Sequence, residues 1–189
     1  MRNTFVALIL LLLTFAAVAS AQIPASGNVF VGYSFENSAS STLDQDLNRP
    51  NLQGWEASLE GKIFPHIGIV TDFSGHYGSQ SFVQLTPGGP VSVNVTGHEL
   101  EVLFGPRISI PVGKFTPFGE FMAGVAHINT GGTDPGPSNT SFATALGGGL
   151  DYRLIRLVAL RVEGDYIRTQ FFNTSQNNLR LSTGLVLRF

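Results

Sequence analysis

The sequence predicts an all-β fold class, an eight-stranded up-and-down antiparallel transmembrane β-barrel. Charged residues make up only 13% of the chain, about half of the ~25% usual for soluble domains, whereas aromatic residues reach 11% and the mean hydropathy is +0.18. Apolar and polar residues alternate with a period of two in eight segments, and none sustains the 3.6-residue period of a helix. Several segments are near the ~9–11 residues that a tilted strand needs to cross hydrocarbon.

The N-terminus predicts a signal peptide over residues 1–21. Arg2 precedes an apolar run from Phe5 to Val18, and Ala19-Ser20-Ala21 then matches an A-x-A cleavage pattern. The run is shorter than the ~20 residues of a spanning helix, so an anchor helix is the less favoured alternative. Residues 22–189 then form one β-barrel domain, in which the lack of cysteine excludes disulfides and thiol catalysis.

Clusters of Gly, Pro, Asn and Ser separate the predicted strands. The strands are expected at residues 28–36, 53–64, 67–77, 93–109, 115–128, 142–153, 157–170 and 178–189. Their connections alternate between short turns, at 65–66, 110–114 and 154–156, and longer loops, at 37–52, 78–92, 129–141 and 171–177. Short turns at one end and longer loops at the other are typical of an outer-membrane barrel with both termini on the periplasmic side.

The two faces of each predicted strand differ in chemistry. In the second strand, Trp55 and Leu59 share one face, whereas Glu56 and Glu60 share the other. A soluble barrel must put the apolar face inside, whereas a membrane barrel turns it to lipid and points its charges into the lumen. Low total charge and long apolar faces favour the membrane barrel; a soluble secreted barrel that binds a small apolar ligand is the alternative.

The same phasing predicts a lumen charge network of ten acids and six bases. Its members are Glu36, Glu56, Glu60, Lys62, Asp72, Glu99, Glu101, Arg107, Glu120, Asp151, Arg153, Arg161, Glu163, Asp165, Arg180 and Arg188. Of the strand charges only Arg168 falls on the outer face. Because an unpaired buried charge is costly, we expect these groups to form ion pairs and hydrogen bonds. Asp72 and His76 share the inner face and are expected to pair.

Two strands fit the alternation badly. Val93 and Val95 are out of phase with the residues that follow, which predicts either a bulge near Gly97 or a strand that starts later. In the next strand, apolar side chains share the inner face with a glutamate; the residues are Phe118, Glu120, Met122 and Ile128. We expect these apolar groups to plug the barrel.

Several motifs resemble the bacterial outer-membrane β-barrel domain family, which is similar to the OmpA transmembrane domain and to OmpX-like small barrels. The matching segments are 145–154, 160–166 and Pro117-Phe118-Gly119 with the small-residue strand 123–126. The ending also resembles the family's C-terminal assembly signal, through Thr183, Gly184, Leu187 and Phe189. The resemblance implies an eight-stranded barrel whose last strand is recognised by the barrel-assembly machinery and closes against the first.

The sequence offers little support for catalysis. The four histidines, at positions 66, 76, 98 and 127, lack a metal-ligand spacing such as H-E-x-x-H, and no G-x-S-x-G nucleophile elbow occurs. Some outer-membrane lipid A deacylases place a serine two residues after a histidine, where His127 has Asn129. We therefore expect no catalytic residues, no cofactor, no bound metal and no enzyme activity.

The predicted function is that of a small integral outer-membrane protein with a structural or surface role in adhesion or envelope integrity. The first alternative is a narrow, cation-preferring, porin-like channel, and the second is a lipid-modifying enzyme. Eight strands enclose an interior that side chains just fill, so no wide pore is expected. The expected partners are outer-membrane lipid, the assembly machinery and a surface ligand of the long loops. Eleven basic against thirteen acidic residues disfavour nucleic acid, and a monomer is expected.

Overall fold

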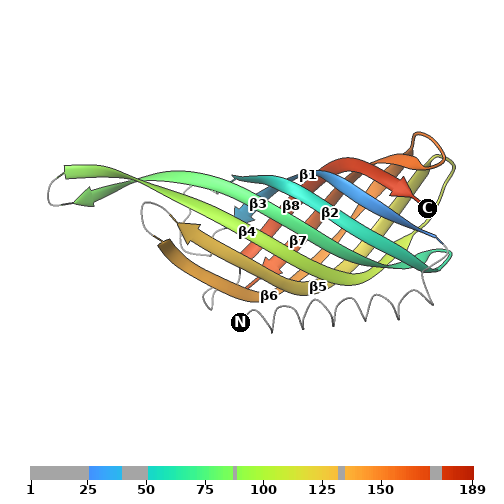
Figure 1. The fold of residues 1–189 in the computed structure, drawn as a ribbon, viewed down its shortest axis with the longest axis horizontal. Helices are drawn as coiled ribbons and strands as arrows, with labels where there is room; N and C mark the ends of the chain where they lie inside the picture. Colours follow the sequence, from blue (N-terminus) through green and yellow to red (C-terminus); the bar gives the residue numbers. More distant parts are fainter. Residues whose placement is uncertain (1–25, 40–50, 87–88, 132–134, 171–175) are drawn as a thin grey trace, which may run out of the picture.

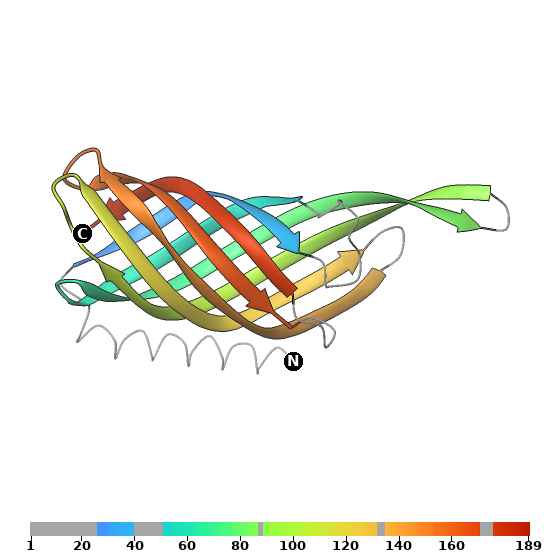
Figure 2. The same cartoon turned by 180° about the vertical axis from the view of Figure 1, so that it is seen from behind.

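The chain forms a closed barrel of eight antiparallel strands (Figures 1 and 2). This computed structural model describes residues 26–39, 51–86, 89–131, 135–170 and 176–189. The strands are β1 (Gly27–Ala39), β2 (Asn51–Phe64), β3 (Ile67–Thr86), β4 (Gly89–Ser109), β5 (Phe115–Gly131), β6 (Pro135–Arg153), β7 (Val158–Thr169) and β8 (Gln176–Arg188). Each strand pairs with the next, and β8 pairs with β1 to close the barrel. These pairings confirm the predicted fold class and strand order. The predicted signal peptide lies outside the described residues.

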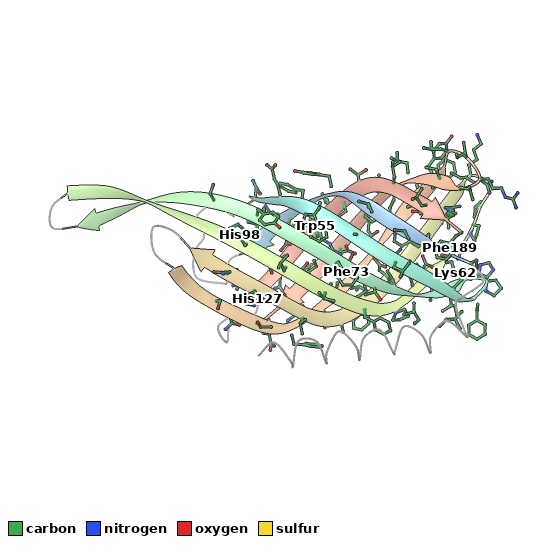
Figure 3. The ribbon with its side chains drawn as sticks, in the orientation of Figure 1. Trp55, Lys62, Phe73, His98, His127 and Phe189 are labelled. Carbon is green, nitrogen blue, oxygen red and sulfur yellow. The ribbon has the colours of Figure 1, made fainter. Side chains whose placement is uncertain are left out.

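The two ends of the barrel differ, and we call them the turn end and the loop end. At the turn end, short connections join β2 to β3, β4 to β5 and β6 to β7. In the second of these, Gly113 has a φ of 63°, a left-handed conformation that glycine adopts without steric cost. Phe189 lies at the same end, where its backbone exchanges two hydrogen bonds with Gly27 (Figure 3). In an outer-membrane barrel this end faces the periplasm.

No described helix of the chain is long and apolar enough to span a membrane.

A long hairpin of β3 and β4 projects from the loop end (Figure 1). β3 and β4 pair continuously from Ile67↔Ile108 to Thr86↔Gly89, whereas β2 stops pairing with β3 at Tyr77. The loop predicted at 78–92 is therefore wrong, since most of it is strand. The predicted loop 129–141 is likewise shortened by β5 and β6. The Ser, Gly and Pro residues of these segments predicted loops. A two-stranded ladder, however, is held by backbone hydrogen bonds and does not require apolar and polar side chains to alternate.

Both explanations offered for the phase of Val93 and Val95 are also wrong. The β3–β4 register runs through Gly97 without a shift, and β4 begins before Val93. β4 pairs with β5 only from Thr96 onward, so Val93 and Val95 belong to the projecting hairpin. In the hairpin the two faces of the strand pair do not separate a lumen from lipid, so apolar and polar side chains need not alternate. The described register shifts lie instead in the β2–β3 and β5–β6 pairs.

The faces of the barrel are arranged as the alternation predicts. Trp55, Phe73 and Leu187 are 43%, 43% and 56% exposed on the outside, whereas Glu60 and Arg180 are 1% and 0% exposed in the lumen. Exposure of a large apolar side chain to water forgoes ~1.5–3 kcal/mol, and every strand presents such residues outward. The outer surface therefore fits hydrocarbon, and a soluble barrel with an apolar centre is excluded.

One part of the lumen is apolar. Met122 from β5 is fully buried and contacts a cluster formed by Val70, Leu103, Ala126, Ala143, Ala145 and Ile167. Ile128 packs against the same cluster, and Phe118 is buried nearer the turn end. The inward position expected for Phe118, Met122 and Ile128 is therefore correct. These side chains fill space that would otherwise admit water.

Candidate functional site

The candidate site is the set of ionisable side chains inside the barrel. Of the sixteen predicted, the structure buries thirteen: Glu36, Glu56, Glu60, Asp72, Glu99, Glu101, Arg107, Glu120, Asp151, Arg161, Glu163, Asp165 and Arg180. Lys62 and Arg188 lie at the turn-end mouth, with side chains 20% and 25% exposed. Arg153 is exposed, and the prediction that placed it in the network is wrong. It is the last residue of β6, beyond the lumen, and its Nη2 donates to the carbonyl oxygen of Gly113 at 2.8 Å.

The ion pairs form two separate groups. The turn-end network joins the bases Lys62, Arg107, Arg161 and Arg188 to the acids Glu60, Glu120, Asp151 and Glu163. Arg107 Nε donates to Glu120 at 2.5 Å, and Arg161 Nε donates to Asp151 at 2.7 Å. Four bases face four acids in this network, so its formal charge is balanced.

Phe118 contacts two arginines of the turn-end network. Its ring lies 4.4 Å from the guanidinium carbon of Arg107 and 4.5 Å from that of Arg161. Arg161 also lies 5.1 Å from the ring of Phe30. A guanidinium over an aromatic face gains ~0.5–2 kcal/mol, most where water is excluded. These inward aromatic residues therefore stabilise the charges as well as fill the lumen.

The loop-end network centres on Arg180, which is fully buried. Its guanidinium contacts four carboxylates, at 2.8 Å from Asp165, 2.9 Å from Asp72 and 3.5 Å from both Glu56 and Glu101. The five residues come from β8, β7, β3, β2 and β4, so this one side chain connects strands around the barrel. A single base here faces four acids.

Beside this network, His76 lies between a serine and a glutamate. Its Nε2 is 2.8 Å from Ser34 Oγ, and its Nδ1 is 3.1 Å from Glu36 Oε2. The expected pairing of His76 with Asp72 is wrong, since Asp72 pairs with Arg180. Alternation shows that these residues face inward, but not that Ser34 and Glu36 of β1 meet His76 of β3 across β2.

This series of a serine, a histidine and a carboxylate resembles the catalytic triad of serine hydrolases. Ser34 and His76 are, however, 0% exposed, and Ser34 also accepts a hydrogen bond from Ser182 at 3.0 Å. Ser34 does not line the cavity at the turn end or the one on the outer surface. The bond that a hydrolase would cleave therefore cannot approach the buried Ser34 hydroxyl in the described part of the chain.

One cavity opens at the turn end and another lies on the apolar surface. The turn-end cavity, of about 220 Å³, is lined by Lys62, Arg107, Asp151 and Arg188, among others. The second, of about 540 Å³, lies against the apolar residues Pro106, Ile108, Ile110, Phe121 and Leu146, among others. Neither includes a residue of the loop-end network. Among the described residues, buried ion pairs and the Met122 cluster occupy the middle of the barrel.

The four residues of the predicted assembly signal lie where β8 closes on β1. Thr183, Leu187 and Phe189 face outward, and Gly184 pairs with Gly32. A Cβ on Gly184 would lie 2.3 Å from the carbonyl oxygen of Val31, so only glycine permits this approach. Recognition of the signal by the assembly machinery stays a prediction.

Comparison with known proteins gives a family match and several similar structures. The model of a family described as the outer membrane protein beta-barrel domain matches residues 6–189. A search of curated proteins found no match to the sequence.

Among solved structures, Neisserial surface protein A is 12% identical, with a TM-score of 0.65 over 87% of this chain and 99% of that one. Ail, the attachment invasion locus protein of Yersinia pestis, is 15% identical, with a TM-score of 0.56 over 88% and 99%. The outer membrane protein OprG from Pseudomonas aeruginosa is 11% identical, with a TM-score of 0.56 over 88% and 96%. At these identities the likeness concerns the fold.

Proposed function

Because the chain belongs to the outer membrane protein beta-barrel domain family, it is a small barrel protein of the bacterial outer membrane, and we propose that it has a structural, surface-exposed role there. In this proposal the barrel anchors the β3–β4 hairpin and the loops at the cell surface, where they recognise a partner. The filled lumen stabilises this anchor and conducts no steady current.

The projecting hairpin is the observation that carries this proposal. Among the described residues, β3 pairs beyond Tyr77 with β4 alone, and residues 78–86 at ~3.3 Å each extend this hairpin by roughly 30 Å. A two-stranded ribbon has an unpaired edge on each side, and such edges pair with other chains. Recognition by strand addition takes its affinity from the main chain and its specificity from alternate side chains.

The composition of the surface segments indicates what kind of partner they bind. Residues 78–96 contain no charged side chain, and the predicted loops hold only Asp44, Asp46, Arg49 and Asp134. Ail has been crystallised with the heparin analogue sucrose octasulfate. This chain has little positive charge to attract such a polyanion, so its proposed partner is held by hydrogen bonds and apolar contacts.

Deletion of the hairpin tip tests the proposal. We would replace residues 80–94 by a two-residue turn and display both proteins on a host that lacks its own adhesins. Attachment to protein-coated surfaces should fall to the level of the empty host, while membrane insertion and the heat-dependent gel shift stay unchanged. Unchanged attachment after the deletion would contradict a recognition role for the hairpin.

The cation channel is the second candidate, because acids outnumber bases in the loop-end network. Planar-bilayer recording separates the two functions. We expect the purified monomer to show no steady single-channel current, since Arg180 and its partners cross the lumen. For the enzyme alternative, we expect expression to leave the mass of lipid A unchanged.

A further inference from the structure

The loop end of the lumen holds a cluster of buried side chains that could bind a metal ion. We propose that Glu36, His76 and Glu101 bind one divalent transition-metal ion of the zinc class. Each offers one ligand atom, and the three atoms lie within 4.8 Å of one another. The residues belong to β1, β3 and β4, so the ion would connect three strands inside the barrel.

Each of the three residues has one atom held by a hydrogen bond and one atom without a hydrogen bond, and two of the latter, His76 Nδ1 and Glu36 Oε2, lie 3.1 Å apart. His76 Nε2 is held by Ser34, Glu36 Oε1 accepts from Asn178 at 2.5 Å, and Glu101 Oε2 accepts from Ser74 at 3.0 Å. The other atoms, His76 Nδ1, Glu36 Oε2 and Glu101 Oε1, are buried without a hydrogen-bond partner. Metal ligands are commonly oriented in this way, by a second contact that fixes the ring or carboxylate.

Charge balance calls for a cation at this place. The turn-end network has as many bases as acids, whereas the ion pairs given for the described residues set Arg180 alone against the four acids of the loop-end network. Glu36 and Glu99 are buried close by and add to the excess. Because a buried carboxylate needs a partner or a proton, a divalent ion would offset part of this charge.

The donor set selects the class of ion. One imidazole nitrogen with carboxylate oxygens suits zinc and its neighbours, whereas calcium and magnesium prefer oxygen ligands alone. Glu99 of β4 stands opposite His76 of β3 in the strand register, and its Oε1 has no hydrogen-bond partner. This oxygen is available as a fourth ligand to the ion. A second cluster, formed by Glu120, Glu163 and Asp165, has no nitrogen donor, and arginines already pair with all three acids.

Metal titration of the refolded barrel, prepared without a histidine tag and stripped with a chelator, tests this site. Calorimetry with zinc chloride should give one ion per barrel. His76→Gln, Glu36→Gln and Glu101→Gln should each lower the affinity at least tenfold. The matched control is Glu163→Gln, which removes a buried carboxylate from the turn-end network and should leave the affinity within twofold. His127→Gln controls for binding to an exposed imidazole.

X-ray absorption at the zinc edge of the wild-type protein provides a reading that does not depend on the variants folding. Scattering from one imidazole and from carboxylate oxygens is expected. The proposal is overturned by a folded wild-type barrel that binds no zinc stoichiometrically, by a shell of oxygens alone, or by equal affinity in folded His76→Gln. A heat-dependent gel shift establishes folding for each sample.

Discussion

Replacing Arg180 by methionine should destabilise the barrel more than any other single loss of charge. The side chain is fully buried and contacts four carboxylates, two of them within 2.9 Å. Arg180→Met removes the base that pairs with all four of these acids. Removing one partner of a buried ion pair typically costs ~3–5 kcal/mol, because the remaining charge is left uncompensated.

The assay is equilibrium unfolding by urea in phospholipid bilayers, followed by tryptophan fluorescence of Trp55. The free energy of unfolding should fall by about 3–5 kcal/mol for Arg180→Met. Arg153→Met is the matched control, because Arg153 is exposed and donates one hydrogen bond to a backbone carbonyl. Its loss should cost about 1 kcal/mol or less.

A double-mutant cycle with Asp165 tests the cause. Asp165 Oδ2 accepts from both Nε and Nη2 of Arg180, at 3.0 and 2.8 Å. Asp165→Asn in the Arg180→Met background should cost at least ~1 kcal/mol less than it does alone, because the carboxylate has lost its partner. Additive effects, or an Arg180→Met protein as stable as the Arg153→Met control, would refute the reasoning.

Three further substitutions test closure, the lumen aromatics and the lipid face. Gly184→Ala should block the heat-dependent gel shift, because the added Cβ would lie 2.3 Å from the Val31 carbonyl oxygen. The control Gly97→Ala should fold, since the added Cβ there would have no atom within 4 Å. Equal folding of the two variants would disprove this account of closure. Phe118→Leu should cost about 1–3 kcal/mol in urea unfolding by removing two guanidinium–ring contacts, and a loss below 0.5 kcal/mol would speak against them. Val162→Arg, on the outer face, should cost ~2–4 kcal/mol in bilayers; a neutral result would mean that this face meets water.

The direction of most strand side chains could be read from the sequence. A strand alternates its side chains with a period of two, so Arg161, Glu163 and Asp165 of β7 had to share a face whatever the rest of the chain did. The low fraction of charged residues then indicated that the apolar face contacts lipid. Phe118 and Met122 were correctly placed inside for the same reason.

Alternation failed where a strand leaves the barrel. Arg153 has the parity of a lumen residue but lies past the end of the enclosed space. Residues 78–92 look like a loop because they are polar and contain Gly and Pro, although most of them continue the β3–β4 ladder. The length of a strand beyond the rim depends on backbone pairing, which places no demand on hydrophobic pattern.

The sequence by itself determined that this chain makes eight strands, that its charges face one another and that its apolar face meets hydrocarbon. Only the tertiary structure decided which charges meet. The stagger of a closed barrel sets which residues of distant strands share one height, and no local pattern encodes it. For this reason His76 lies beside Glu36 and Glu101, whereas Asp72 pairs with Arg180. The spacing of these three residues in the sequence gives no sign of the metal site that we propose for them.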